Sequence, residues 1–219
     1  MGGILPRLRR AAAASGGGTA AAVLPTGSAF RQAEAVHERM STQLQTPRLS
    51  LSMIIEDDVE ELHTIFSDPL THTVGGGPFT SLRQTEDWVA RRAQRYAEHG
   101  LAWYAVRETT TAELLGNAGL FMGRAGAEPE IGYEVRSTWQ GQGVATDAAT
   151  EVVAEAVRRG WPRLWATVRP ENLASRTVLH RLGFVEDGVR GSEEGPLLYL
   201  RRESATASEA RHAARGRLP

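Results

Sequence analysis

The chain has 219 residues, of which 41% are hydrophobic and 23% charged, with a formal net charge of −1. This balance is typical of a folded globular chain and gives no long-range attraction to nucleic acid or an anionic membrane. The lack of cysteine excludes a disulfide framework, an iron–sulfur cluster, a thiolate zinc site and a cysteine nucleophile. No apolar run approaches the roughly 18 residues of a membrane-spanning helix.

Both ends of the chain lack the periodic apolar pattern of a folded element. Residues 1–45 are largely rich in alanine and glycine, and residues 203–219 consist mainly of Ala, Ser and Arg. For residues 1–39 a transit peptide, a disordered extension and sequence translated ahead of a start at Met40 all remain open. We expect disorder in both ends and one domain over residues 46–202.

Apolar periodicity predicts alternating strands and helices between these ends. Alternate apolar residues over 49–53 indicate a half-buried strand, and a continuous apolar stripe over 144–157 indicates a long amphipathic helix. The expected strands are 49–53, 102–107, 114–122, 130–135, 164–168, 183–185 and 197–201, and the expected helices are 57/58–66, 81–98, 142/143–159 and 173–182. This order predicts a mixed α/β (α+β) class with a central sheet.

A glycine-containing turn leads directly into the long helix. Gly141 and Gly143 free the backbone between a predicted strand and the helix. The first N–H groups of a helix lack intrahelical partners and lie at its positive end, so they form an anion site. We therefore expect phosphate binding at the backbone of residues 142–146, although glycines before a helix are also ordinary loop residues.

The residues of this turn and of the next predicted strand limit which phosphate-containing ligands the turn is expected to bind. Gly141-x-Gly143-x-x-Thr146 imitates a dinucleotide fingerprint, but Thr167 and Arg169 occur where an acidic ribose-binding residue would end the next strand. All basic residues are arginine, so a P-loop with its lysine is excluded. A nucleotide-binding α/β domain of another kind remains an alternative.

Three groups of residues resemble the GNAT N-acetyltransferase superfamily. Residues 140–145 are similar to its Q/R-x-x-G-x-G/A loop for the pyrophosphate of acetyl-CoA, and residues 172–184 are similar to its N-x-x-S…G-F segment. Residues 46–49 and 131–133 further resemble the branch of ribosomal-protein alanine acetyltransferases, which usually has Glu in place of Asp147. The resemblance spans nearly all of the expected domain.

This resemblance implies one GNAT-like domain with a largely antiparallel sheet that is splayed between its fourth and fifth expected strands. Acetyl-CoA is the implied co-substrate, and the strand ending at Val135 would pair with its pantetheine arm. Asn172 would bind the cofactor or cap the following helix. The implied cofactor-binding residues are Val135, Gln140, Gly141, Gln142, Gly143, Val144, Ala145, Thr146 and Asn172.

Acetyl transfer to an amine needs a proton acceptor and a proton donor. The resemblance implies that Ser175 lies near the sulfur and donates to the departing thiolate; an ordinary solvated serine is the alternative. Glu134 is the expected general base, with Glu130 on the same strand face as the other candidate. Either glutamate could instead be an exposed strand residue.

Few residues suggest the identity of the acceptor. Trp103 or Tyr104 could line the acceptor cleft, although the tryptophans are more typical of packing. Arg91, Arg92 and Arg95 are expected on a solvated helix face, with contact to an acidic acceptor as the alternative.

These observations predict an acetyl-CoA-dependent N-acetyltransferase that acts directly on a primary amine, either a protein N-terminus or a small molecule. A non-catalytic acyl-CoA-binding or sensing module on the same scaffold is the main alternative. His63, His72 and His99 lack metal-ligand spacing, so no metal is expected. We further expect no nucleic-acid or membrane partner, a monomer or homodimer, and a cytoplasmic location.

Overall fold

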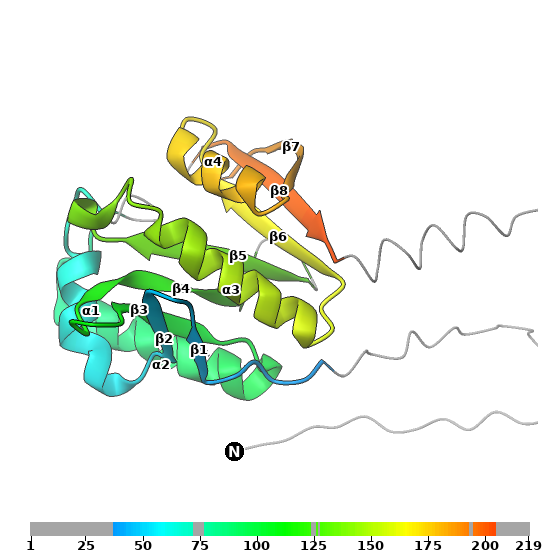
Figure 1. Cartoon of the computed structure of the whole chain (residues 1–219). Coiled ribbons are helices and arrows are strands. Elements are labelled where there is room, and N and C mark those ends of the chain that lie inside the picture. The colour runs from blue at the N-terminus through cyan, green and yellow to red at the C-terminus, as the bar shows by residue number, and fades with distance from the viewer. Residues whose placement is uncertain (1–36, 72–76, 124–125, 127, 193–194, 205–219) are drawn as a thin grey trace, which may run out of the picture. The chain divides into compact units, whose positions relative to one another are not determined.

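The computed structural model describes residues 37–71, 77–123, 126, 128–192 and 195–204 (Figure 1). The strands are β1 (Gln43–Gln45), β2 (Leu49–Met53), β3 (Trp103–Glu108), β4 (Leu114–Met122), β5 (Pro129–Val135), β6 (Arg163–Val168), β7 (Val185–Arg190) and β8 (Leu197–Glu203). The helices are α1 (Val59–Phe66), α2 (Leu82–His99), α3 (Val144–Arg158) and α4 (Leu173–Arg181), with short 3-10 helices η1 (Glu56–Asp58) and η2 (Ser137–Trp139). The predicted class and the order of the predicted elements are confirmed.

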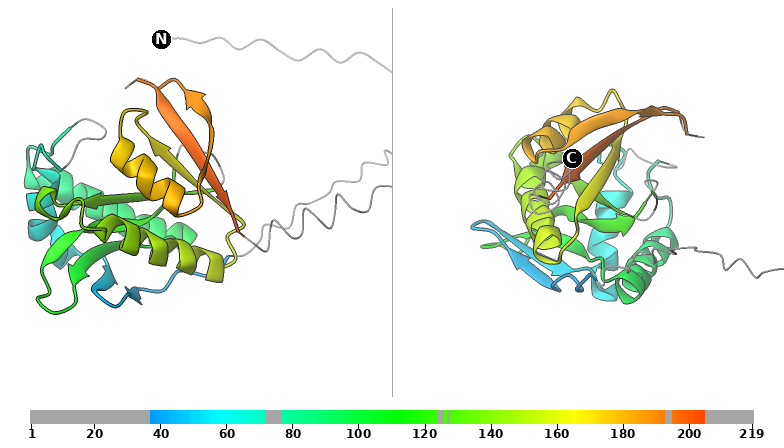
Figure 2. Two further views of the ribbon diagram at one scale, coloured as in Figure 1. Left: turned by 45° about the horizontal axis from the view of Figure 1, so that its top comes forward. Right: turned by 90° about the vertical axis from the view of Figure 1, so that its right-hand side faces the viewer.

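The described strands form one sheet in the order β1-β2-β3-β4-β5-β6-β8-β7. All neighbours are antiparallel except β5 and β6, which run parallel and are in register at one pair, Glu130 opposite Trp165. Figures 1 and 2 show β6 leaving β5 at an angle. The sheet is therefore splayed between β5 and β6, which are the fourth and fifth strands expected from the sequence.

Helices cover both faces of the sheet (Figures 1 and 2). The apolar stripe of α3, including Val144, Ala148 and Val152, is buried in the main core against one face. Apolar residues of α1 and α2 form a second cluster with Trp103 on the other face. The two cores hold β4 and β5 between the helices, so the side chains of these strands project alternately toward α3 and toward α1 and α2.

The packed chain begins before Thr46, the residue at which the sequence pattern placed the domain boundary. β1 pairs with β2, and His37 stacks on Trp161 with ring centroids 3.7 Å apart. Met40 is 1% exposed, and its N–H donates to Gly100 O at 2.9 Å. These contacts join segments far apart in sequence, which a local apolar pattern cannot reveal. The expectations for residues 1–36 and 205–219 lie outside the described residues.

The C-terminal hairpin also differs from the prediction. β7 continues to Arg190, whereas the apolar pattern indicated a strand only around Val185. All six residues of β7 are exposed, so no alternation marks the strand in the sequence. No helix within the described ranges combines the length and the apolar character that a bilayer crossing requires.

Candidate active site

The loop before α3 has the geometry expected of an anion site. Gly141 and Gly143 have φ values of +74° and +80°, which residues with a side chain rarely adopt. The first intrahelical acceptor is Gly143 O, which receives the N–H of Asp147 at 3.0 Å. The N–H groups of Val144 to Thr146 precede that bond, and within the described part of the chain they have no acceptor. The predicted bare helix start is thus present.

Arg48, near the start of β2, fixes this loop from the outside. Its Nη2 donates to Gln142 O at 2.9 Å, and its Nε lies 2.5 Å from Asp147 Oδ2. Gln140 Nε2 donates to Val135 O at 3.0 Å, which attaches the loop to the end of β5. In the sequence Arg48 belongs to a family-like segment and Asp147 is a departure from the family pattern, and their mutual contact is visible only in the structure.

A cavity of about 730 Å³ runs from this loop through the splay between β5 and β6. Nearly all the residues expected in the site line it, and Gln142 does not. The expected residues that line it are Glu130, Glu134, Val135, Gln140, Gly141, Gly143, Val144, Ala145, Thr146, Asn172 and Ser175. The structure therefore brings the predicted cofactor loop and the predicted catalytic residues to one continuous space.

On the α4 side of the cavity, Ser175 is half-buried and hydrogen-bonded to a tyrosine. Its Oγ lies 2.9 Å from the hydroxyl of Tyr133, which also donates to Ser175 O at 3.1 Å. Burial raises the pKa of Tyr133 to about 12, so the phenol keeps its proton at neutral pH. Asn172 Oδ1 accepts from Ser175 N at 3.0 Å, which confirms its predicted role as helix cap.

The two candidate bases lie on the opposite face of β5 from Tyr133. β5 pairs with β4 without a bulge, Glu134 opposite Asn117 and Glu130 opposite Phe121, so the two carboxylates share one face as predicted. Glu130 is 1% exposed and accepts a short hydrogen bond from the Thr167 hydroxyl on β6. Glu134 is half-buried and lines the cavity. Neither is a fully exposed strand residue.

The cavity continues over the same face beneath α2. Trp103 lines it, whereas Tyr104 is fully buried on the other face and donates from its hydroxyl to Ser41 O at 2.7 Å. Arg92 also lines it, contrary to the solvated face expected for the α2 arginines, because its guanidinium stacks over aromatic rings. Asn117 completes this end, and no sequence signal pointed to it because only strand register brings it here.

Within the described ranges no three His, Asp or Glu side chains gather in a way that could hold a metal ion; His72 lies outside those ranges.

Comparisons with known proteins agree with this geometry. Residues 48–185 match the family model described as Acetyltransferase (GNAT) domain. The uncharacterized N-acetyltransferase YoaA of Bacillus subtilis is 31% identical over 150 residues, covering 67% of this chain and 84% of that protein. The fold is similar to an acetyltransferase from Agrobacterium tumefaciens, with a TM-score of 0.65, 24% identity and 74% and 94% of the two chains covered.

A second solved structure, RimL, a ribosomal L7/L12 alpha-N-protein acetyltransferase in complex with coenzyme A, is similar in fold to this chain. Its TM-score is 0.64 at 20% identity, with 76% of this chain and 98% of RimL covered. This likeness shows that the two chains share one fold. The family match covers more than half of the chain, and the YoaA identity supports it independently. The chain therefore belongs to the GNAT acetyltransferase family, whose members transfer acetyl groups.

Proposed function

We propose that the chain is an acetyl-CoA-dependent N-acetyltransferase that modifies a primary amine by direct attack in a ternary complex. The observation that carries the proposal is the opening of the α3 helix start into the cavity between β5 and β6. Two glycines at left-handed positions keep side chains away from the N–H groups of Val144 to Thr146, so a diphosphate can approach them. The N-acetyltransferase name of YoaA and the coenzyme A in the RimL complex support it.

Acetyl-CoA supplies an acetyl group that is activated as a thioester. The N–H groups at the start of α3 would bind the pyrophosphate, and the end of β5 near Val135 would pair with the pantetheine amides. Asn172, already engaged as the cap of α4, would keep the start of that helix beside the thioester. Catalysis would depend mainly on holding the amine against the acetyl carbon.

An alkylamine with a pKa of about 10 is mostly protonated at neutral pH, so a base must take a proton before attack. Glu134 would take it, directly or through water, with Glu130 as the alternative base. The new N–C bond forms as the C–S bond breaks. The hydroxyl of Ser175 would protonate the departing sulfur and be reprotonated through water by the second proton that the amine nitrogen loses. Tyr133, hydrogen-bonded to Ser175, would orient that hydroxyl.

Ligand-dependent thermal stability tests the cofactor part of the proposal. Coenzyme A and acetyl-CoA should raise the Tm, and ATP and NAD should not. Gly143→Glu should remove most of this shift, and Gly143→Gln, which carries the same backbone strain without the charge, should retain more of it. Gly191→Glu, at an exposed glycine with nothing near its Cβ position, serves as the remote control. A larger Tm shift with ATP or NAD would contradict the proposal.

Release of free thiol from acetyl-CoA over a panel of amines tests turnover. The panel should include small amines and peptides with free N-termini, because both carry the primary amine that the reaction needs and RimL is named for a protein N-terminus. Glu134→Gln and Ser175→Ala should each lower kcat by roughly tenfold to a thousandfold. Binding of coenzyme A without turnover of any amine would favour a non-catalytic sensing module instead.

A further inference from the structure

Arg92 is a cation in the cavity wall that has no acidic partner among the described residues. Its Cζ lies 4.6 Å from the ring centroid of Trp88, 4.1 Å from that of Trp103 and 5.2 Å from that of Phe121. Its Nε is buried and donates to no described acceptor. Arg83 and Arg95 on the same helix do pair with carboxylates. Acidic residues are therefore present on α2, but none of the described ones pairs with Arg92.

Such an arrangement is costly without a ligand. Burial, together with the nearby charges of Arg91 and Arg95, lowers the pKa of Arg92 to about 10, so it is still protonated at neutral pH. A desolvated cation without a counter-ion is unfavourable, and stacking on aromatic rings offsets only part of this cost. The aromatic rings offer Nε no hydrogen-bond acceptor, and a guanidinium binds a planar anion through its N–H edge, for which a carboxylate is the best match.

Asn117 provides a second unused donor in the same cavity. Trp103 Nε1 donates to Asn117 Oδ1 at 2.9 Å, and because an indole N–H can only donate, this bond fixes the orientation of the amide. The remaining Nδ2 is buried and has no partner among the residues that the structure describes, and Asn117 is only 2% exposed. A buried amide donor normally has an acceptor, and this one lines the cavity, so it can donate to an oxygen atom of a ligand.

Trp103 connects this donor end with the acidic strand face. A Cβ atom on Gly132 would lie 2.6 Å from Trp103 Cη2, so the far edge of the indole rests on Gly132. Glu130 and Glu134 flank Gly132 on that face of β5, while Arg92 stacks over the same indole. Asn117 lies directly opposite Glu134 across the β4–β5 pairing, so the carboxylates of β5 and the two donors lie on one face around the indole of Trp103.

We propose that Arg92 and Asn117 bind a carboxylate of the acceptor, so that the acceptor is a small molecule with both a primary amine and a carboxylate, as in an amino acid. The ammonium end lies toward Glu134 and the thioester, and because Asn117 is the neighbour of Glu134 across the β4–β5 pairing, the two charged groups of the acceptor bind close together beside the indole of Trp103. Arg92 is then the residue that selects the substrate. This inference rests on the proposed acetyl transfer to an amine.

Matched acceptors isolate the contribution of the carboxylate. We would measure kcat/KM at saturating acetyl-CoA for the common L-amino acids, their primary amides and the corresponding decarboxylated amines. The amine of an amide is less basic, so a site indifferent to the carboxylate would favour the amide. We expect the best free acid to exceed its own amide by about tenfold or more, because a site built to bind a polar group rejects the analogue that lacks it.

Substitutions in α2 test whether the preference for the free acid over its amide depends on Arg92. Arg92→Gln should lower kcat/KM for the acid by about a hundredfold and leave the amide nearly unchanged, and Arg92→Lys should fall between, since it keeps the charge without the planar fork. Arg91→Gln, an exposed neighbour on the same helix, should leave the preference intact. Turnover of amides or plain amines as fast as acids would overturn the inference while the proposed function stands.

The affinity for the acetylated product tests the inference without depending on catalysis. In the presence of coenzyme A, quenching of tryptophan fluorescence would give the Kd of N-acetyl amino acids and of their amides. The acid product should bind about tenfold more tightly than its amide, and Arg92→Gln should abolish the difference. Equal binding of the two products would overturn the inference. Loss of turnover on every amine, with this binding difference retained, would overturn only the proposed function.

Discussion

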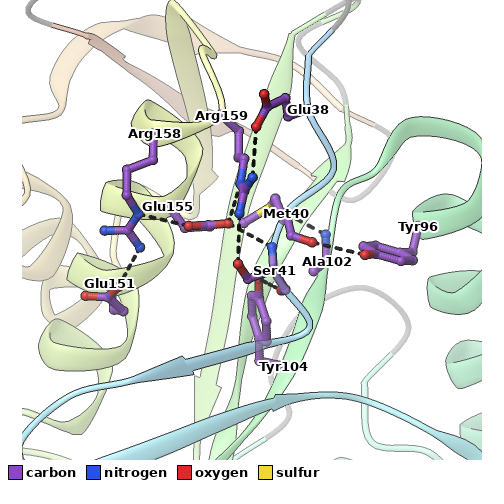
Figure 3. Close-up of polar contacts among 10 residues, drawn as sticks. All are labelled: Glu38, Met40, Ser41, Tyr96, Ala102, Tyr104, Glu151, Glu155, Arg158 and Arg159. Carbon is purple, nitrogen blue, oxygen red and sulfur yellow. Dashed lines mark hydrogen bonds and ion pairs between the residues drawn. The ribbon is translucent and has the colours of Figure 1, made fainter.

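The carboxylate of Glu155 in α3 accepts a hydrogen bond from the backbone N–H of Ser41 at 2.7 Å (Figure 3). Glu155 is 2% exposed and also accepts from Arg159 at 2.7 Å and from Arg158 at 2.9 Å. Arg159 Nη2 in turn donates to Ser41 Oγ at 2.9 Å. One buried acid therefore attaches the segment before β1 to the helix whose start forms the candidate cofactor site.

Replacement of Glu155 by Gln should therefore destabilise the whole domain. A glutamine leaves the two arginines without their buried counter-charge, and we expect the free energy of unfolding to fall by about 3 kcal/mol. Urea denaturation at pH 7 measures this change. Glu151→Gln removes a partner of Arg158 that is more exposed, and it should cost less than about 1 kcal/mol. Equal losses in the two variants would contradict this role.

The same group predicts a loss of stability in acid. Burial alone would raise the pKa of Glu155, but the hydrogen bonds from Ser41, Arg159 and Arg158 outweigh it and lower the pKa to about 2. Because the folded pKa lies below the unfolded value of 4.5, the stabilisation of about 3 kcal/mol is complete above pH 4.5 and is lost between about pH 4.5 and 2. Denaturation curves at several pH values should show Glu155→Gln and the parent converging there. A constant difference down to pH 2 would contradict it.

Local pattern was sufficient for most of the elements and insufficient for this attachment. The stripe of α3 and the Ser81–Gln84 capping box, in which Gln84 Oε1 accepts the N–H of Ser81 at 3.1 Å, were readable because helix periodicity and capping are local. The segment before β1 shows no apolar period, and β1 itself spans three residues with only one of them buried. Its position depends on Glu155, more than a hundred residues away in sequence.

Tyr133→Phe tests the proposed orientation of Ser175. The change removes the hydroxyl that lies 2.9 Å from Ser175 Oγ and keeps the ring, so the KM for acetyl-CoA should stay nearly constant while kcat falls by about tenfold. Steady-state kinetics on a confirmed acceptor measures both. If the two residues act together, adding Tyr133→Phe to Ser175→Ala should cost little more than Ser175→Ala alone. Fully additive losses would show that the two residues act separately.

In the candidate site, too, one part is predictable from the local sequence and another part depends on contacts between distant segments. The loop at Gly141 and Gly143 was predictable because a glycine turn followed by a helix is a local signal with its own chemistry. Tyr133 belongs to a family-like segment, but its contact with Ser175 is visible only once α4 is in place, and Arg92 looks like any other helix arginine until Trp103 is beneath it. The acceptor end of the site is thus assembled by tertiary contacts between β3, β4, β5 and α2.

Arg48→Gln should weaken binding of acetyl-CoA without changing the chemical step. Arg48 attaches the loop to β2 through Gln142 O and pairs with Asp147 in the first turn of α3, and its side chain is partly exposed. We expect the Kd for coenzyme A to rise about five- to tenfold and kcat to change little, since the loop loses preorganisation. Calorimetry on the parent and the variant tests this. Arg83→Gln, at a distant exposed arginine, should leave the Kd unchanged.

Arg92→Met should stabilise the protein while it impairs acceptor selection. Methionine has a similar length and can pack against Trp88, Trp103 and Phe121 without a desolvated charge between Arg91 and Arg95. The lost cation–π contacts are smaller than the cost of an unpaired buried cation, so the free energy of unfolding should rise by about 1 kcal/mol. Urea denaturation of the ligand-free protein measures it, with Arg91→Met as the control. A gain is expected because residues kept for function are commonly unfavourable for stability. A loss of more than about 2 kcal/mol would instead show that Arg92 stabilises the fold.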